Sequence, residues 1–110
     1  MRLNSMFALI TILGLLISAQ VAAECERVNR SDNVVLMSCA QVVDAEAMVA
    51  VAKEECGEDK TCNVWFWSSE VGLPDTAPAT DAELPTALTS KALAVWANDS
   101  GSLMTLKKKN

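Results

Sequence analysis

The residues best suited to contact a ligand lie in segment 56–67, where Trp65, Phe66 and Trp67 follow one another. Alternate residues of a β-strand project to the same face, so a strand here would place Trp65 and Trp67 side by side. Two adjacent indoles form an apolar surface that can stack on a sugar or peptide, or bury into a partner protein. We therefore predict Trp65 and Trp67 as binding residues. The alternative is that both belong to the core, covered by a later helix that carries Trp96 or by a loop.

The chain lacks the residues on which many hydrolases depend. It contains no His, which excludes His-based catalytic triads, His general bases and His metal ligands. A Ser or Thr nucleophile would need a Lys or a carboxylate as its base, and no motif surrounds any candidate. The carboxylates of Glu70, Asp75 and Asp81 could supply an acid and a base for glycoside hydrolysis, but their spacing does not place them together. We predict a protein that is not an enzyme and has no cofactor or metal, with a small carboxylate-based hydrolase as the alternative.

The charge of the chain restricts its partners. The formal net charge is −5, and it becomes −6 if Arg2 is removed with a leader peptide. Nucleic-acid binding depends on Lys and Arg that neutralise phosphates, so we predict no nucleic-acid partner. Acidic residues gather between positions 54 and 59 without the regular offsets of a calcium loop. We interpret this cluster as a solvated, charged helix end.

The four cysteines are Cys25, Cys39, Cys56 and Cys62. Their spacing contains no C-x-x-C, which argues against a zinc site or a thioredoxin-like redox motif. An even number of cysteines in a short exported chain is typical of disulfides, and three pairings are possible.

Two of the cysteines, Cys56 and Cys62, flank a polar turn, which favours a bond between them. The other two are symmetric about Asp32. A hairpin that turns there would oppose positions 29 and 35, 27 and 37, and 25 and 39. We predict the disulfides Cys25–Cys39 and Cys56–Cys62.

Residues 1–23 have the pattern of a secretory signal peptide. Arg2 precedes the apolar run 6–17, and small residues end at Ala23, where we predict cleavage. The run is shorter than the ~20 residues that a membrane-spanning helix needs, so we expect no stable membrane anchor after cleavage. Residues 24–110 then form a single small domain, which is periplasmic or secreted.

The remaining patterns predict the elements that position these residues. Val34–Cys39 is rich in β-branched residues and favours a strand, and Asp44 caps a helix that ends before Gly57. A strand over 63–67 is followed by a long loop over 68–80, a possible binding loop. A capping box near Thr80 predicts a second helix that runs to about Ala97. Its apolar residues at helical spacing are Leu88, Ala92, Val95 and Trp96. A short strand over 103–106 precedes a Lys tail.

This order of elements, β-β-α-β-α-β, predicts an α/β (α+β) fold. We expect a small two-layer sandwich, in which two helices pack on a mixed sheet of three to four strands. A right-handed crossover would make the strands 34–39 and 63–67 parallel. A disulfide between Cys56, at the helix end, and Cys62 would turn Val64 and Phe66 toward that helix. Trp65 and Trp67 would then occupy the opposite face, which stays open if both helices lie on one side.

These patterns predict a small exported binding or interaction protein: an inhibitor, an immunity-type protein or an accessory protein. Its partner would be another protein or an envelope ligand. Besides the hydrolase, a secreted toxin or effector is a further alternative to this binding protein. Asn29 and Asn98 each match the short acceptor pattern for N-glycosylation.

Overall fold

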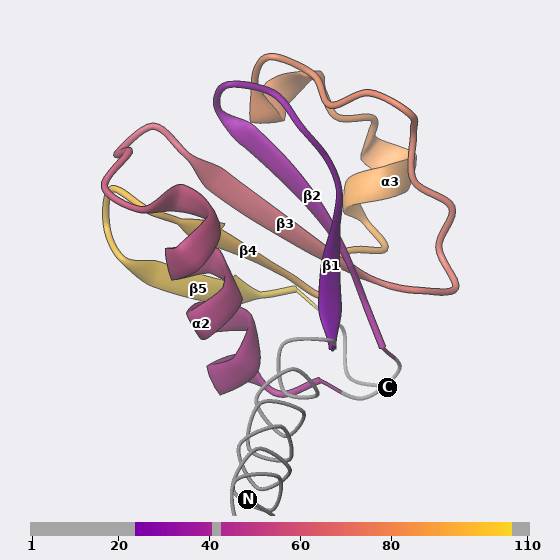
Figure 1. The fold of residues 1–110 in the computed structure, drawn as a ribbon. Helices are drawn as coiled ribbons and strands as arrows, with labels where there is room; N and C mark the ends of the chain where they lie inside the picture. Colours follow the sequence, from indigo (N-terminus) through magenta and orange to yellow (C-terminus); the bar gives the residue numbers. More distant parts are fainter. Residues whose placement is uncertain (1–23, 41–42, 107–110) are drawn as a thin grey trace, which may run out of the picture.

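The computed structural model describes residues 24–40 and 43–106. The predicted leader and the Lys tail lie outside these residues. Within them, a five-stranded mixed sheet carries one long helix on one face and a loop with a short helix on the other (Figure 1). The strands follow the order of the chain across the sheet. The elements are β1 (Cys25–Arg30), β2 (Val34–Cys39), α2 (Ala45–Cys56), β3 (Asn63–Ser68), the 3-10 turn η1 (Asp81–Glu83), α3 (Thr86–Thr89), β4 (Ala94–Ala97) and β5 (Ser102–Thr105).

The hairpin of β1 and β2 matches the predicted pairing at one end only. Cys25 lies opposite Cys39, and their disulfide joins Cα atoms 3.9 Å apart, which confirms this bond. The predicted pairing of positions 29 and 35 is wrong, because Asn29 lies opposite Leu36. A β-bulge between Arg27 and Asn29 shifts the register by one residue.

The crossover from β2 through α2 to β3 is parallel, as predicted. The side chain of Asp44 accepts a hydrogen bond from the Ala47 amide and caps the helix. Gly57 ends it with φ 57°, a conformation that favours glycine. The predicted Cys56–Cys62 disulfide is confirmed, and it ties the helix end to the start of β3.

The predicted second helix is wrong over most of its length. A 3-10 turn and the short helix α3 occupy its first part, and Ala94–Ala97 forms the strand β4. Ala94 and Trp96 alternate toward the α2 face and pair with Phe66 and Val64 of β3. Pairing on the uncovered edge of β3 therefore prevailed over helical spacing. The sheet gains a strand beyond the predicted three to four, and the predicted strand 103–106 becomes β5.

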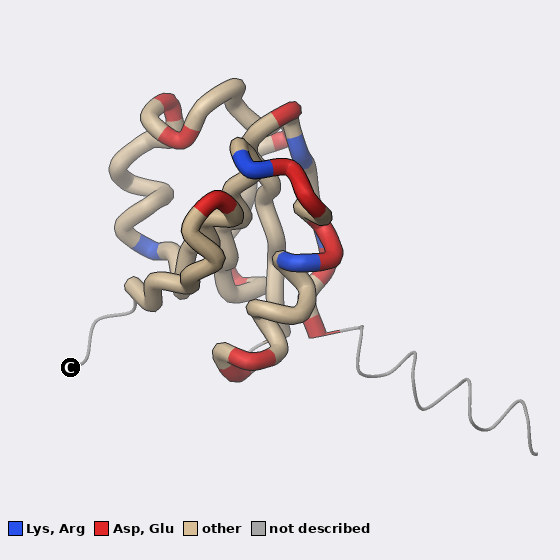
Figure 2. The backbone as a smooth tube through the Cα atoms, turned by 90° about the vertical axis from the view of Figure 1, so that its left-hand side faces the viewer, with Lys and Arg blue, Asp and Glu red and all other residues tan. Residues whose placement is uncertain are grey.

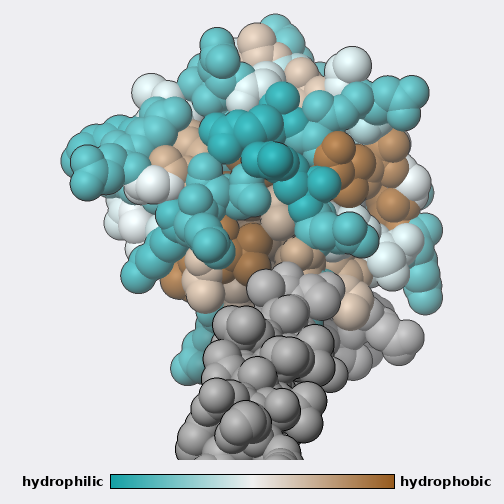
Figure 3. All heavy atoms as spheres, viewed as in Figure 1, coloured by the Kyte–Doolittle hydropathy of each residue, from teal (hydrophilic) through white to brown (hydrophobic). Residues whose placement is uncertain are grey.

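Two apolar clusters fill the two faces of the sheet. The α2 face buries both disulfides together with the side chains that include Phe66, Val64 and Trp96. On the other face, Trp67, Val34 and Leu36 pack beneath the segment that follows β3. Apolar atoms reach the surface on that side of the molecule, over the loop and α3 (Figure 3).

Charged residues lie on β1, on α2 and on the connecting turns (Figure 2). The strands β2 to β5 contain no Asp, Glu, Lys or Arg. Across the described part of the chain, we find no helix with the length and hydropathy required to span a membrane.

Candidate binding surface

The two tryptophans of β3 lie on the face opposite α2, as the disulfide predicted. Their ring centroids are 6.0 Å apart and the rings are stacked at 20°. Trp67 is nevertheless completely buried, and its indole Nε1 donates a hydrogen bond of 2.8 Å to the carbonyl of Leu88. The open two-ring platform is therefore wrong, because α3 and the loop before it cover Trp67. Of the two covers considered in the alternative interpretation, the loop packs over Trp67, whereas Trp96 lies on the α2 face.

Trp65 is only half-buried, and a carboxylate fixes its position. Its Nε1 donates to Oδ1 of Asp81 over 3.0 Å. The side-chain amide of Asn63 donates to Oδ2 of the same carboxylate. Asp81 thus connects the turn η1 to β3 through both of its oxygens. Its role in this structure is to hold the covering segment on the sheet.

The three carboxylates considered for hydrolysis do not form a common site. Asp81 accepts hydrogen bonds from Trp65 and Asn63, as described above. Glu70 lines a groove of about 520 Å³ between the loop and α3, and neither Asp75 nor Asp81 contributes to its walls. Asp75 is exposed, and its backbone carbonyl accepts a hydrogen bond from Asn29 of β1. The arrangement does not pair an acid with a base across a cavity.

An apolar row crosses the sheet on the Trp65 face. Adjacent strands place Leu36 beside Trp65, Trp65 beside Val95, and Val95 beside Met104. Exposure increases along the row, from 0% at Leu36 through the half-buried Trp65 and Val95 to 60% at Met104. The loop layer therefore covers one half of this face and leaves the half formed by β4 and β5 accessible. We call Trp65, Val95 and Met104 the open row.

A small cavity of about 340 Å³ lies beside the open row. Trp65, Thr89, Ser90 and Leu106 form its walls. Residues at the end of α3 and directly after β5 therefore line this cavity together with Trp65. The lining combines apolar side chains with hydroxyl groups.

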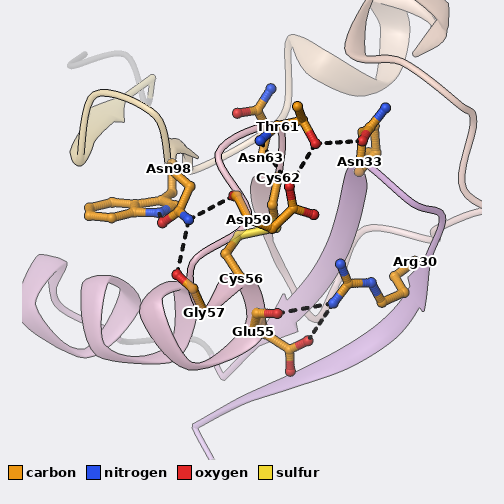
Figure 4. The surroundings of a disulfide bond; sticks show 12 residues. Arg30, Asn33, Glu55, Cys56, Gly57, Asp59, Thr61, Cys62, Asn63 and Asn98 are labelled. Carbon is orange, nitrogen blue, oxygen red and sulfur yellow. Dashed lines mark hydrogen bonds and ion pairs between the residues drawn. A yellow bond between two sulfur atoms is a disulfide. The ribbon is translucent and has the colours of Figure 1, made fainter.

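The opposite side of the molecule contains a polar network around the Cys56–Cys62 disulfide (Figure 4). Asn98 accepts a hydrogen bond of 2.9 Å from Trp96 Nε1 and donates to the carbonyls of Gly57 and Asp59. The network joins the turn after α2 to the end of β4. In the sequence, Asn98 matches an acceptor pattern for N-glycosylation, and that pattern does not indicate this role.

The acidic cluster at the end of α2 is held by local partners. Glu55 forms ion pairs with Arg27 and Arg30 of β1, at 3.2 and 3.8 Å. The hydroxyl and backbone amide of Thr61 donate to Asp59, which lowers the pKa of that carboxyl. Among residues 24–40 and 43–106, no group of three His, Cys, Asp or Glu could hold a metal ion.

The binding candidates change accordingly. Trp65 remains accessible, Trp67 does not, and Val95 and Met104 are additions. The sequence indicated a place for Met104 on one sheet face, since neighbouring residues of the predicted strand 103–106 point to opposite faces and Leu103 is its neighbour. Val95 was assigned to a helix, which concealed its place beside Trp65.

No family model, curated protein or solved structure matches this chain in the three comparisons made.

Proposed function

We propose that this chain is a small exported binding protein without catalytic activity, and that it contacts a partner protein through the open row. The observation that carries this proposal is the continuous apolar path from buried Leu36 to Met104, which is 60% exposed. Contiguous accessible apolar patches on a protein surface mark interaction sites. The dispersed carboxylates support a role other than hydrolysis.

The chemistry of the surface favours a protein as the partner. One face of the Trp65 ring is stacked on Trp67, so a sugar would find a single indole and not a two-ring platform. The strands beneath the open row carry no charged residues, which suits an apolar partner surface. The acidic net charge disfavours nucleic acid.

The cysteines and the N-terminal sequence support an exported location for this protein. Both disulfides are characteristic of proteins in an oxidising, extracellular-type environment. The signal-peptide pattern of residues 1–23 supports export to the periplasm or the medium. An inhibitor, an immunity-type protein or an accessory protein fits both features.

Affinity capture from the envelope fraction of the native host tests the surface. The bait is the mature chain, compared with Met104→Glu and with the matched control Val28→Glu. Val28 is the other exposed large apolar residue among those described, at 43%, and it lies on the opposite edge strand. We expect a specific partner to bind the wild type and Val28→Glu but not Met104→Glu. Equal recovery with both variants would show that the open row is not the contact surface.

The identity of the captured protein separates the remaining functions. A single host protein recovered in stoichiometric amounts supports an inhibitor, immunity-type or accessory role. If the host envelope yields no partner and the same bait captures a target from an extract of a competing organism, the protein would instead be a secreted toxin or effector.

A further inference from the structure

The two edge strands of the sheet differ in how they are protected against pairing. β1 contains a bulge at Val28 and the charged residues Glu26, Arg27 and Arg30. β5 has the sequence Ser-Leu-Met-Thr, without charge, proline or bulge, and pairs in continuous register with β4. Charges and bulges are the usual devices that keep sheet edges from associating. The β5 edge lacks them within its own length.

The hydrogen-bonding groups of β5 alternate between β4 and the free edge. The amide of Leu106 donates to the carbonyl of Leu93, which fixes the phase of the ladder. In an antiparallel pair every second residue bonds to the neighbouring strand. Ser102 and Met104 therefore bond toward β4, whereas Leu103 and Thr105 direct their N–H and C=O groups outward.

We propose that the β5 edge pairs antiparallel with β5 of a second copy of this chain. The outward groups are self-complementary, because Leu103 of one copy can exchange N–H···O bonds with Thr105 of the other, on both sides of a twofold axis. Met104 then faces Met104 of the second copy. The side chains of a directly opposed pair lie on the same face of the sheet, so the two open rows join into one.

The charges that flank β5 favour this antiparallel arrangement. Asp99 precedes the strand in the sequence, and Lys107, Lys108 and Lys109 follow it. Antiparallel pairing brings the C-terminal end of one β5 next to the N-terminal end of the other, so segments of opposite charge in the sequence adjoin the same end of the pair. A parallel arrangement would place like charges together.

This proposal goes beyond the proposed function, and it extends that function because the dimer would present a contact surface of doubled width to the partner. Edge pairing leaves the sheet faces free, so both open rows remain accessible. The interface is small, and we expect a dissociation constant between about 1 µM and 1 mM.

Sedimentation equilibrium of the oxidised mature chain tests the pairing, with Thr105→Pro and the matched control Thr105→Val. Proline removes an N–H that points to the free edge, which an edge strand tolerates. We expect Thr105→Pro to raise the dissociation constant at least about tenfold, because the twofold axis doubles the loss of donors. Thr105→Val keeps the amide and should stay close to the wild type. A wild type that is monomeric throughout this range, or equal effects of the two variants, would overturn the proposal.

Cysteine cross-linking tests the register independently. Directly opposed residues that do not exchange hydrogen bonds have Cα atoms about 4.5 Å apart, as in the cross-strand Cys25–Cys39 bond. Met104→Cys should therefore form covalent dimers on mild oxidation, whereas Ser102→Cys, distant from its own copy, should not. Non-reducing peptide mapping confirms that the native disulfides persist. Cross-linking through Ser102→Cys but not through Met104→Cys would overturn the register.

The two proposals fail in different ways. A monomeric wild type that still captures its partner through Met104 would refute the dimer alone. A dimer whose partner binding does not depend on Met104 would refute the proposed contact surface alone.

Discussion

Replacing Asp81 with Ala should destabilise the fold, because this carboxylate holds the covering segment against the sheet. The variant loses the hydrogen bonds from Trp65 Nε1 and from the Asn63 amide. A buried hydrogen bond to a charged group contributes about 1.5–3 kcal/mol. Asp81 is half-buried, so we take about 1–1.5 kcal/mol for each bond. The free energy of unfolding should fall by about 2–3 kcal/mol, which lowers Tm by roughly 10–20 °C for a domain of this size.

Two further variants isolate the contribution of the carboxylate. Glu83 belongs to the same 3-10 turn and is exposed, so Glu83→Ala should change the free energy of unfolding by no more than about 0.5 kcal/mol. Asp81→Asn keeps one acceptor oxygen, but its amide NH₂ group then faces one of the two N–H donors, from Trp65 or from Asn63. Its effect should fall between those of the two alanine variants.

Urea denaturation followed by circular dichroism measures these differences. Trp emission gives a second readout, since release of the covering segment exposes the buried Trp67 and shifts its emission to the red. If Asp81→Ala and Glu83→Ala had equal unfolding midpoints, the carboxylate would not be what holds this segment. The reasoning about Trp65 and Asn63 would then be refuted.

Three other predictions concern the remaining polar contacts and the exposed tryptophan. Asn98→Ala should lower the free energy of unfolding by about 1–2 kcal/mol, since the Trp96 indole loses its acceptor; an unchanged urea midpoint would contradict this. Trp65→Phe should abolish most acrylamide quenching, because Trp67 and Trp96 are 0% and 3% exposed; persistent quenching would show that another indole is accessible. Hydrogen bonds from Thr61 lower the pKa of Asp59 in the folded state. The ionised carboxylate therefore stabilises the fold at any pH above 3.8, the ordinary pKa of the group, and this contribution is lost as the pH falls through the lower folded pKa. Between about pH 7 and pH 2.5, Asp59→Asn should therefore lose less stability than the wild type, and parallel losses would contradict the assignment.

Much of the fold could be predicted where local pattern and cysteine position agreed. The β-branched run Val34–Cys39 and the capped helix from Ala45 are strong local signals. The Cys56–Cys62 bond then fixed the phase of β3, since alternation from Cys62 decides which side chains face α2. For this reason Trp65 and Trp67 were placed on the correct face.

The strand β4 could not be predicted, because its sequence fits two periods. Leu88, Ala92, Val95 and Trp96 satisfy helical spacing, while Ala94 and Trp96 alternate as a strand requires. The tertiary partner decided between them, since β3 offers an edge that only a strand can satisfy. The bulge at Val28 could not be predicted either, because position 28 holds neither a glycine nor a turn-forming residue.

The candidate site was only partly predictable for the same reason. Whether Trp67 is exposed depends on where the segment 69–92 lies, and Asp81 anchors that segment through contacts distant in sequence. Val95 and Met104 join the open row only because residues 94–97 form the strand β4, and the helical spacing of the sequence led to the prediction of a helix there.

The spacing of the disulfides has a consequence for how the chain matures. Each bond joins cysteines that are consecutive along the chain, with separations of 14 and 6 residues. An oxidant that acts on thiols in the order in which they emerge from a translocation channel therefore produces the native pairs directly. Cys25 meets Cys39 before Cys56 appears, so no wrong bond has to be reshuffled. The strands also follow chain order across the sheet, so each new segment finds its neighbour already in place. If the chain is exported as proposed, we expect it to reach its native form without a disulfide isomerase.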